Sequence, residues 1–311
     1  MTEGLPVALL RLVRRDLLTS HDSELIDFKA FVSSQRYTVD STAAPASLRP
    51  YMSDELIAAC AGDCSKFARA ALESISGIVT DARAPRNTAW FVVHAYYAAF
   101  YSAHALLRLF GVLCSNIDGT EFARLQEAAR VTGQTFPQKG FFRINVSTNL
   151  NSLTFEPLKN SHEDTWATVI SVLDQLRDQA AIADAPKTSR DAAVELLSRH
   201  MARLTDDQQF SKGNFLSYAR NQVQYRFAYR TWYPYGVKNF PPAASLEEIA
   251  VSVLEDRFQE IPGESDLVRF ANGALSFCQF TLKIVDTVLA EQTNFSRHLS
   301  RDYMRVKNFH H

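Results

Sequence analysis

The residues of this chain best suited to chemistry lie in one segment, Phe215 to Gly236, which reads FLSYARNQVQYRFAYRTWYPYG. Its polar members, set among aromatic side chains, are Arg220, Asn221, Tyr225, Arg226 and Arg230. An arginine presents a rigid fork of N–H donors that matches the oxygens of a phosphate. We therefore expect the segment to bind an anion such as phosphate. A contact between subunits is the alternative that the same pattern fits.

Cleavage of RNA without a metal needs a group that moves protons and cations that stabilise charge on the phosphate. We expect Arg220 and Arg226 to neutralise the phosphate. Asn221 would orient the substrate or Tyr225, and Tyr225 would transfer the proton or contact the phosphate. A tyrosine has an unperturbed pKa of about 10, so this use requires neighbouring arginines to favour the phenolate.

Helical periodicity divides the segment into two faces. Asn221 and Tyr225 are four residues apart and share one face. The opposite, apolar stripe consists of Phe215, Ala219, Val223 and Phe227. Arg226 falls close to the line of Ala219, on the buried side, so it needs an internal partner or a helix distorted near Tyr225. A buried Tyr/Arg network that holds a bundle together is the alternative interpretation.

A second basic group lies near the C-terminus, where Arg297, Arg301 and Arg305 repeat every fourth residue. On a helix they would form one basic stripe, which suits a phosphate backbone. Together with Arg230 they are the candidate RNA contacts. A solvated helix face is the alternative for this run.

The histidines elsewhere are weaker candidates. His94 and His104 are ten residues apart and point to different helix faces, which favours hydrogen-bonded core histidines over a shared metal site. His162 lies in the first turn of an expected helix, where Ser161 and Asp164 resemble a capping box. It is a minor candidate for a proton carrier that reaches an active cleft.

No motif points to a metal or a cofactor. Cys60 and Cys64 lie one helical turn apart, yet no Cys/His pair at suitable spacing completes a zinc site, so they are expected to be small buried residues. The chain contains no glycine-rich phosphate loop, dinucleotide fingerprint or nucleophile elbow. We expect neither a bound metal nor a cofactor.

Composition indicates an ordinary globular protein. The 311 residues are 46% hydrophobic and 22% charged, with a formal net charge of −1. This charge gives no global attraction to nucleic acid, so RNA binding requires a local patch. Four scattered cysteines and no secretory signal predict a cytoplasmic protein.

The segment from Trp90 to Leu113 is apolar enough to raise the question of a membrane span. It contains His94, His104 and Arg108, and its tyrosines sit at mid-segment instead of at the two ends. A spanning helix keeps ionisable groups out and aromatic residues at the interfaces. The segment therefore predicts the central helix of a bundle and no membrane contact.

Helical patterns dominate the rest of the chain. The predicted helices are 6–19, 53–78, 87–113, 161–183, 188–204, 214–231, 246–259 and 265–291. Residues 32–50 are predicted to be a connector, and Ser115–Glu156 an irregular insertion whose β-like runs suit a small hairpin. The sequence thus predicts an all-α fold. An N-terminal helical segment and connector covers residues 1–52, and a helical domain covers 53–311 with an insertion at about 115–160.

Two features resemble the HEPN family. The stretch WFVVHAYYAAFYSAHALLRLFG (Trp90–Gly111) is similar to the Tyr/Ala-rich helix of HEPN domains. Arg220-Asn221 resembles the start of the HEPN motif, which is Arg, a polar residue often Asn, several variable positions and then His. Where that histidine would fall, this chain has Tyr225, and no histidine occurs between His200 and His298.

The resemblance implies a helical bundle that pairs as a homodimer through its central helices. It further implies RNA binding with metal-independent endoribonuclease action, in a toxin–antitoxin or antiphage defence system with an antitoxin or defence partner protein. Because the motif histidine is absent, a second hypothesis stays open. In that hypothesis the chain is a non-catalytic HEPN-like adaptor or scaffold that binds a partner protein or ligand.

Overall fold

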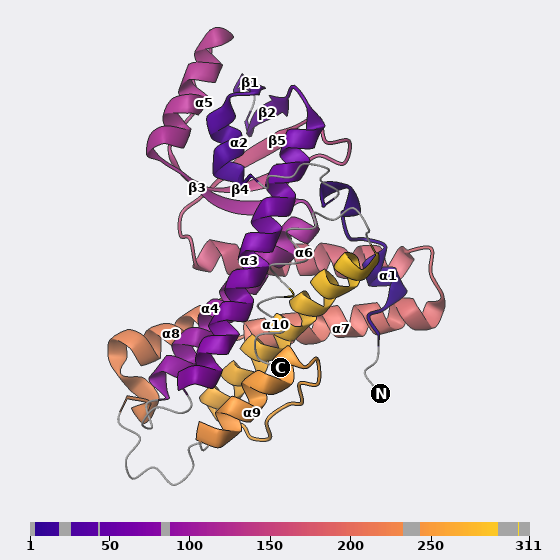
Figure 1. Ribbon diagram of the computed structural model, residues 1–311, viewed down its shortest axis with the longest axis vertical. Helices are drawn as coiled ribbons and strands as arrows, with labels where there is room; N and C mark the ends of the chain where they lie inside the picture. The colour runs from indigo at the N-terminus through magenta and orange to yellow at the C-terminus, as the bar shows by residue number, and fades with distance from the viewer. Residues whose placement is uncertain are drawn as a thin grey trace.

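The computed structural model describes residues 4–18, 26–42, 44–81, 88–232, 243–291 and 304. Helices form a bundle at one end and a five-stranded antiparallel sheet with two covering helices lies at the other (Figure 1). The all-α prediction was therefore wrong, since the protein has a mixed α/β fold. Both stretches without helical periodicity, the supposed connector and the supposed insertion, supply strands to the same sheet.

The sheet has the strand order β1-β2-β5-β4-β3, with all neighbours antiparallel. Its strands are β1 (Tyr37–Asp40), β2 (Ala46–Pro50), β3 (Val112–Ile117), β4 (Gly140–Val146) and β5 (Leu153–Leu158). The pairing of β2 with β5 sets Ala46 opposite Phe155 and Leu48 opposite Leu153. This ladder joins segments about a hundred residues apart in the chain, which no local pattern specifies.

Alternating burial shows why these segments are strands. In β4, Phe142, Ile144 and Val146 are buried while the residues between them are partly exposed. This period of two points one row of side chains toward a core. The core is closed by α2 (Phe28–Ser34) and α5 (Gly119–Val131). At the other end, β3 contacts the bundle through Val112 and Cys114.

The bundle is organised around α3 (Ser53–Asp81) and α4 (Ala89–Leu109), which pack along their lengths. The remaining helices are α6 (Glu163–Ile182), α7 (Lys187–Thr205), α8 (Phe215–Arg226), α9 (Ala243–Leu254) and α10 (Asp266–Glu291). Most residues of α4 are buried, which confirms the predicted central helix. The predicted helix at 6–19 is replaced by α1 (Val7–Leu10) and a 3₁₀ turn, η1 (Arg15–Leu17).

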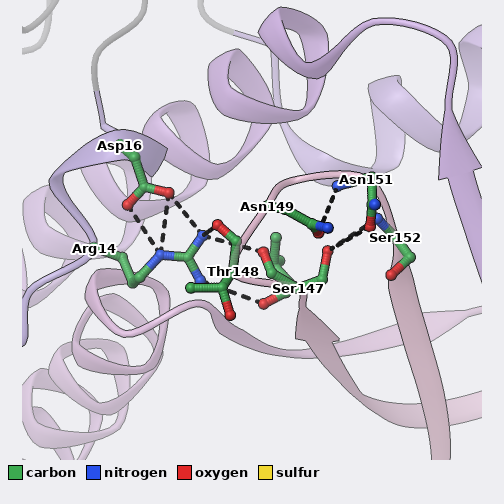
Figure 2. Close-up of polar contacts among 8 residues, drawn as sticks. Arg14, Asp16, Ser147, Thr148, Asn149, Asn151 and Ser152 are labelled. Atoms are coloured by element: carbon green, nitrogen blue, oxygen red, sulfur yellow. Dashed lines mark hydrogen bonds and ion pairs between the residues drawn. The ribbon is translucent and has the colours of Figure 1, made fainter.

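The N-terminal segment is attached to the sheet through Arg14 (Figure 2). Its guanidinium donates to the carbonyl oxygens of Ser147 at 3.2 Å and Thr148 at 3.4 Å, in the turn between β4 and β5. It also pairs with Asp16 at 2.7 Å. The backbone N–H of Arg14 donates to Leu109 O at 2.8 Å. These bonds join the N-terminus, the end of α4 and the sheet.

Helix α10 is long and apolar enough to cross a membrane by length and composition alone. About two-thirds of its most apolar window is buried inside the molecule. The helix shows the burial expected of a core element of a bundle.

A buried ion pair fixes α4 to α3 where the bundle meets the sheet. Arg108 is 2% exposed and donates to Asp63 Oδ2 through Nε at 3.1 Å and Nη2 at 2.8 Å. Asp63 Oδ1 accepts the backbone N–H of Phe28 at 3.4 Å. Since the pair is removed from water, the loss of either partner leaves an uncompensated charge.

We expect Asp63→Asn to lower the free energy of unfolding by about 3–5 kcal/mol, because Arg108 is left buried without its carboxylate. Asp174→Asn is the matched control, since Asp174 pairs with Arg177 on the surface of α6 and exposed pairs contribute only about 0–1 kcal/mol. Urea unfolding of the three proteins measures both values. Equal losses for the two variants would contradict the role given to Arg108–Asp63.

Candidate functional site

Helix α8 divides its polar residues between two directions. Arg220 is 5% exposed and turns inward toward α4, whereas Asn221, Tyr225 and Arg226 are exposed. The neighbours Arg220 and Asn221 therefore do not act at one point, because successive helical residues lie about 100° apart. The structure brings Arg220 and Tyr225 near each other, with the guanidinium 5.9 Å from the ring centre.

One prediction for this helix was wrong, since Phe227 was expected in the apolar stripe and is 64% exposed. Arg226 is exposed, which agrees with the alternative of a helix that distorts near Tyr225. The cause is the helix end. Phe227 adopts a left-handed conformation with φ of 52°, which terminates α8 at Arg226 and redirects the chain. The other three members of the stripe are buried, as predicted: Phe215, Ala219 and Val223.

The remaining candidate RNA contacts are Arg230, Arg297, Arg301 and Arg305. Arg230 ends the 3₁₀ turn η2 (Ala228–Arg230), and its side chain is outside the described set. Arg297, Arg301 and Arg305 lie outside the described residues.

The guanidinium of Arg220 is enclosed by aromatic rings. It lies 4.7 Å from the centre of Tyr96 and 5.9 Å from that of Tyr97. Nη1 donates to Gln224 Oε1 at 3.2 Å, and the buried Nε has no hydrogen-bond partner. No carboxylate in the described part of the chain pairs with Arg220. Cation–π contacts compensate part of its desolvation.

Tyr96 connects Arg220 to His162. The Tyr96 hydroxyl and His162 Nδ1 lie 2.7 Å apart, within hydrogen-bond distance. Burial raises the pKa of Tyr96, while contacts with Trp166, Ser217 and Arg220 oppose the rise, so the phenol stays protonated at neutral pH. Nε2 of His162 has no hydrogen-bond partner within the described ranges. The two ring nitrogens thus have different surroundings. In a histidine, the hydrogen bond made by one nitrogen determines whether the other carries the proton.

The pKa of His162 is lowered from its usual 6.5, first by burial and then by the positive charge of Arg220. The ring is therefore neutral at pH 7 and can accept a proton.

Backbone capping fixes His162 at the start of α6. Asn160 Oδ1 accepts the N–H groups of His162 at 3.0 Å and Glu163 at 3.3 Å. Asp164 Oδ2 accepts the N–H groups of Lys159 at 2.7 Å and Asn160 at 2.8 Å. The predicted cap by Ser161 was wrong, since Asn160 takes that position. Asp164 does reach back to the start of the helix, as a capping box requires.

His162 borders a cavity of ≈ 290 Å³ at the junction of bundle and sheet. Other residues that line it include Lys66, Phe100, His104, Arg108 and Asn116. The Phe100 ring lies between the two imidazoles, 4.6 Å from His162 and 4.7 Å from His104. Burial, then Arg108 and His162, hold the pKa of His104 well below 6.5. The cavity thus has two neutral imidazoles on its walls, together with the ion pairs Arg108–Asp63 and Lys66–Asp27.

His104 is buried and stacks on Phe67 at 4.7 Å, which confirms the prediction of a core histidine. Cys60 and Cys64 are buried free thiols, also as predicted, and burial raises the pKa of each to about 12. No group of three or more metal-ligating side chains occurs in the part of the chain that the structure describes.

Sequence reasoning ranked His162 as minor and did not single out Tyr96. The Tyr/Ala-rich pattern of α4 marked a buried helix, and nothing in it distinguishes Tyr96 from Tyr97 or Tyr101. The sequence indicated His162 only through its position in the first turn of a predicted helix. That position does not reveal that the ring contacts Tyr96. No protein-family model, no curated protein and no solved structure matches this chain, so the HEPN resemblance stays an expectation.

We expect Arg220→Gln to raise the pKa of His162 toward 6.5, because it removes the positive charge that opposes protonation of the ring. Arg226→Gln on the same helix is the matched control, since its side chain is exposed and solvent screens its charge. NMR titration of the imidazole Cε1–H, assigned with His162→Gln, measures the shift. An unchanged titration in Arg220→Gln would show that Arg220 does not act on His162.

Proposed function

We propose that this protein binds RNA and cleaves it without a metal, at a site formed by Arg220, Tyr96 and His162. One observation supports the proposal above the others. A buried arginine that pairs with no described carboxylate and a neutral imidazole contact the same tyrosine, Arg220 over its ring and His162 at its hydroxyl. This arrangement gives the arginine helix the proton carrier that its sequence lacks.

In the proposed reaction His162 Nε2 accepts the proton of a ribose 2′-hydroxyl. The 2′ oxygen forms a bond to phosphorus and the bond from phosphorus to the 5′ oxygen breaks. The leaving 5′ oxygen takes a proton from solvent, and His162 returns its proton to solvent. Arg220 stabilises the negative charge that grows on the phosphate oxygens. Electrostatic stabilisation of this kind is usually the largest single contribution to catalysis.

The role of Tyr225 changes in this mechanism. Its ring is 66% exposed and lies beside Arg220. An exposed aromatic ring next to a phosphate-binding arginine suits stacking of an unpaired base. Arg226 is also exposed, and in this proposal it contacts the RNA backbone. Single-stranded RNA is the substrate class that uses both features.

We expect His162→Gln to reduce RNA cleavage in the presence of chelator by about 10²-fold or more, and Arg220→Gln by about 10²–10³-fold. Cleavage by wild type should also fall as the pH drops through the lowered pKa of His162, since the base must be neutral. Gel analysis of a mixed-sequence RNA measures the rates.

Arg177→Gln is the control for these variants, since Arg177 lies on the outer face of α6 and pairs there with Asp174 and Asp178. Circular dichroism verifies that each variant is folded. Absence of cleavage by wild type, or equal rates for wild type and His162→Gln, would remove the catalytic proposal.

A second candidate function is self-association, which is favoured by an aromatic surface beside the site. Trp90, Tyr225 and Phe227 are 47%, 66% and 64% exposed. The centre of the Trp232 ring lies 5.7 Å from that of Trp90 and 6.1 Å from that of Phe227. Trp90, Trp232 and Phe227 therefore form a continuous aromatic group. Exposed apolar groups of this kind mark interaction surfaces. The partner proposed here is a second copy of the chain.

We expect the Trp90→Ser/Phe227→Ser double variant to shift the protein from dimer to monomer, because it removes the apolar contact area that drives association. The double variant Val131→Ser/Ile182→Ser is the control, since both of its residues are more than 80% exposed and lie on other elements. Sedimentation velocity measures the oligomeric state. A wild type that is monomeric at high concentration, or a double variant that dimerises as well as wild type, would exclude the aromatic surface as an interface between copies.

A further inference from the structure

A second and larger cavity lies in the bundle, away from the residues of the proposed RNA site. It has a volume of ≈ 420 Å³ and is bounded by α7, α10, the segment 4–6 and the chain after α9. The lining residues used below are Arg199, His200, Arg203, Phe258, Phe280 and Lys283. This volume falls in the range of small-molecule sites.

His200 is the unusual residue of this cavity. It is 3% exposed, and its ring stacks on Phe280 with centres 4.4 Å apart. Nδ1 is buried without a hydrogen-bond partner. Burial, then Arg203 and Arg199, lower the pKa of His200 to about 3, so the ring is neutral with one donor and one acceptor.

Unpaired polar groups in a protein interior are costly and few. One hydrogen-bonding group of a ligand would pair with one ring nitrogen of His200, since the two nitrogens point in diverging directions and a single flat edge cannot reach both. Its stacking on Phe280 leaves the ring edge as the part that can bind.

The cations of the cavity are held by carboxylates at its outer side. Arg199 pairs with Glu195 at 2.6 Å, and Arg203 pairs with Glu260. The side chains of Glu195 and Glu260 are 72% and 60% exposed, while that of Arg203 is 19% exposed. Exposed carboxylates are weak partners that a ligand anion can replace.

Lys283 adds a third positive charge from α10 and pairs with Asp256 at 3.2 Å. Arg199 and Arg203 are four residues apart and therefore share one face of α7. The three cations line the cavity together with the carboxylates of Glu195 and Glu260 and the rings of Phe258 and Phe280.

We propose that this cavity binds a nucleoside monophosphate. The phosphate contacts Arg199, Arg203 and Lys283, the base packs among the aromatic rings, and the edge of the base hydrogen-bonds to His200. A nucleobase fits because it is flat and carries hydrogen-bonding groups on its edge, whereas inorganic phosphate uses only the cations. The site shares no residue with the proposed RNA site, so either can exist without the other.

Calorimetric titration of the full chain with adenosine 5′-monophosphate tests the proposal. Wild type is expected to bind one equivalent, and His200→Phe to bind at least about tenfold more weakly, because the substitution keeps the stacked ring but removes both nitrogens. Arg203→Met is expected to lose affinity to a similar extent. Arg124→Met, on the exposed face of α5, should bind as wild type does.

Thermal unfolding without ligand separates binding from structure. His200→Phe should be at least as stable as wild type, since an unpaired polar ring is replaced by an apolar one of similar shape. No binding by wild type up to about 10 mM nucleotide, equal affinity in His200→Phe, or inorganic phosphate binding as tightly as the nucleotide would each overturn the proposal.

Discussion

The burial of α4 on nearly all its sides is the constraint on which the rest of the structure depends. A polar side chain on such a helix must be paired by a neighbouring element, because water cannot reach it. Tyr96 meets His162 from α6, Arg108 meets Asp63 from α3, and His104 stacks on Phe67. Each of these pairs fixes another element relative to α4, so the polar groups of the central helix position the candidate site.

The same helix sets the boundary between the two parts of the fold. Its C-terminal end carries Arg108, which lies beside the cavity where the bundle meets the sheet. The charge of Arg108 is balanced by Asp63, which in turn holds the start of α2. A cavity at this junction has rigid walls from both layers, and such walls keep catalytic groups in place. The helix packing here rests on Arg108 and Asp63, and His162 of the proposed site borders the same cavity.

The sequence was informative where the physics is local. The long amphipathic and apolar periods of α3, α4, α6, α7 and α10 were predicted because helix formation depends on residues three and four apart. The sheet was missed, because β2 pairs with β5 across a hundred residues and each strand is short. Phe227 was misplaced because its left-handed conformation ends α8 at Arg226. Arg220 was found from its residue type, but its enclosure by Tyr96 and Tyr97 follows from packing between helices, which spacing within one helix does not reveal.

The central claim is that Tyr96 holds His162 with Nδ1 occupied and Nε2 ready to accept a proton. Long-range ¹⁵N–¹H NMR of the imidazole at pH 7, assigned with His162→Gln, identifies which nitrogen carries the hydrogen. The account predicts a neutral ring protonated at Nδ1, which donates to the Tyr96 oxygen, with an unprotonated Nε2. A ring protonated at Nε2, or a charged imidazolium, would contradict it.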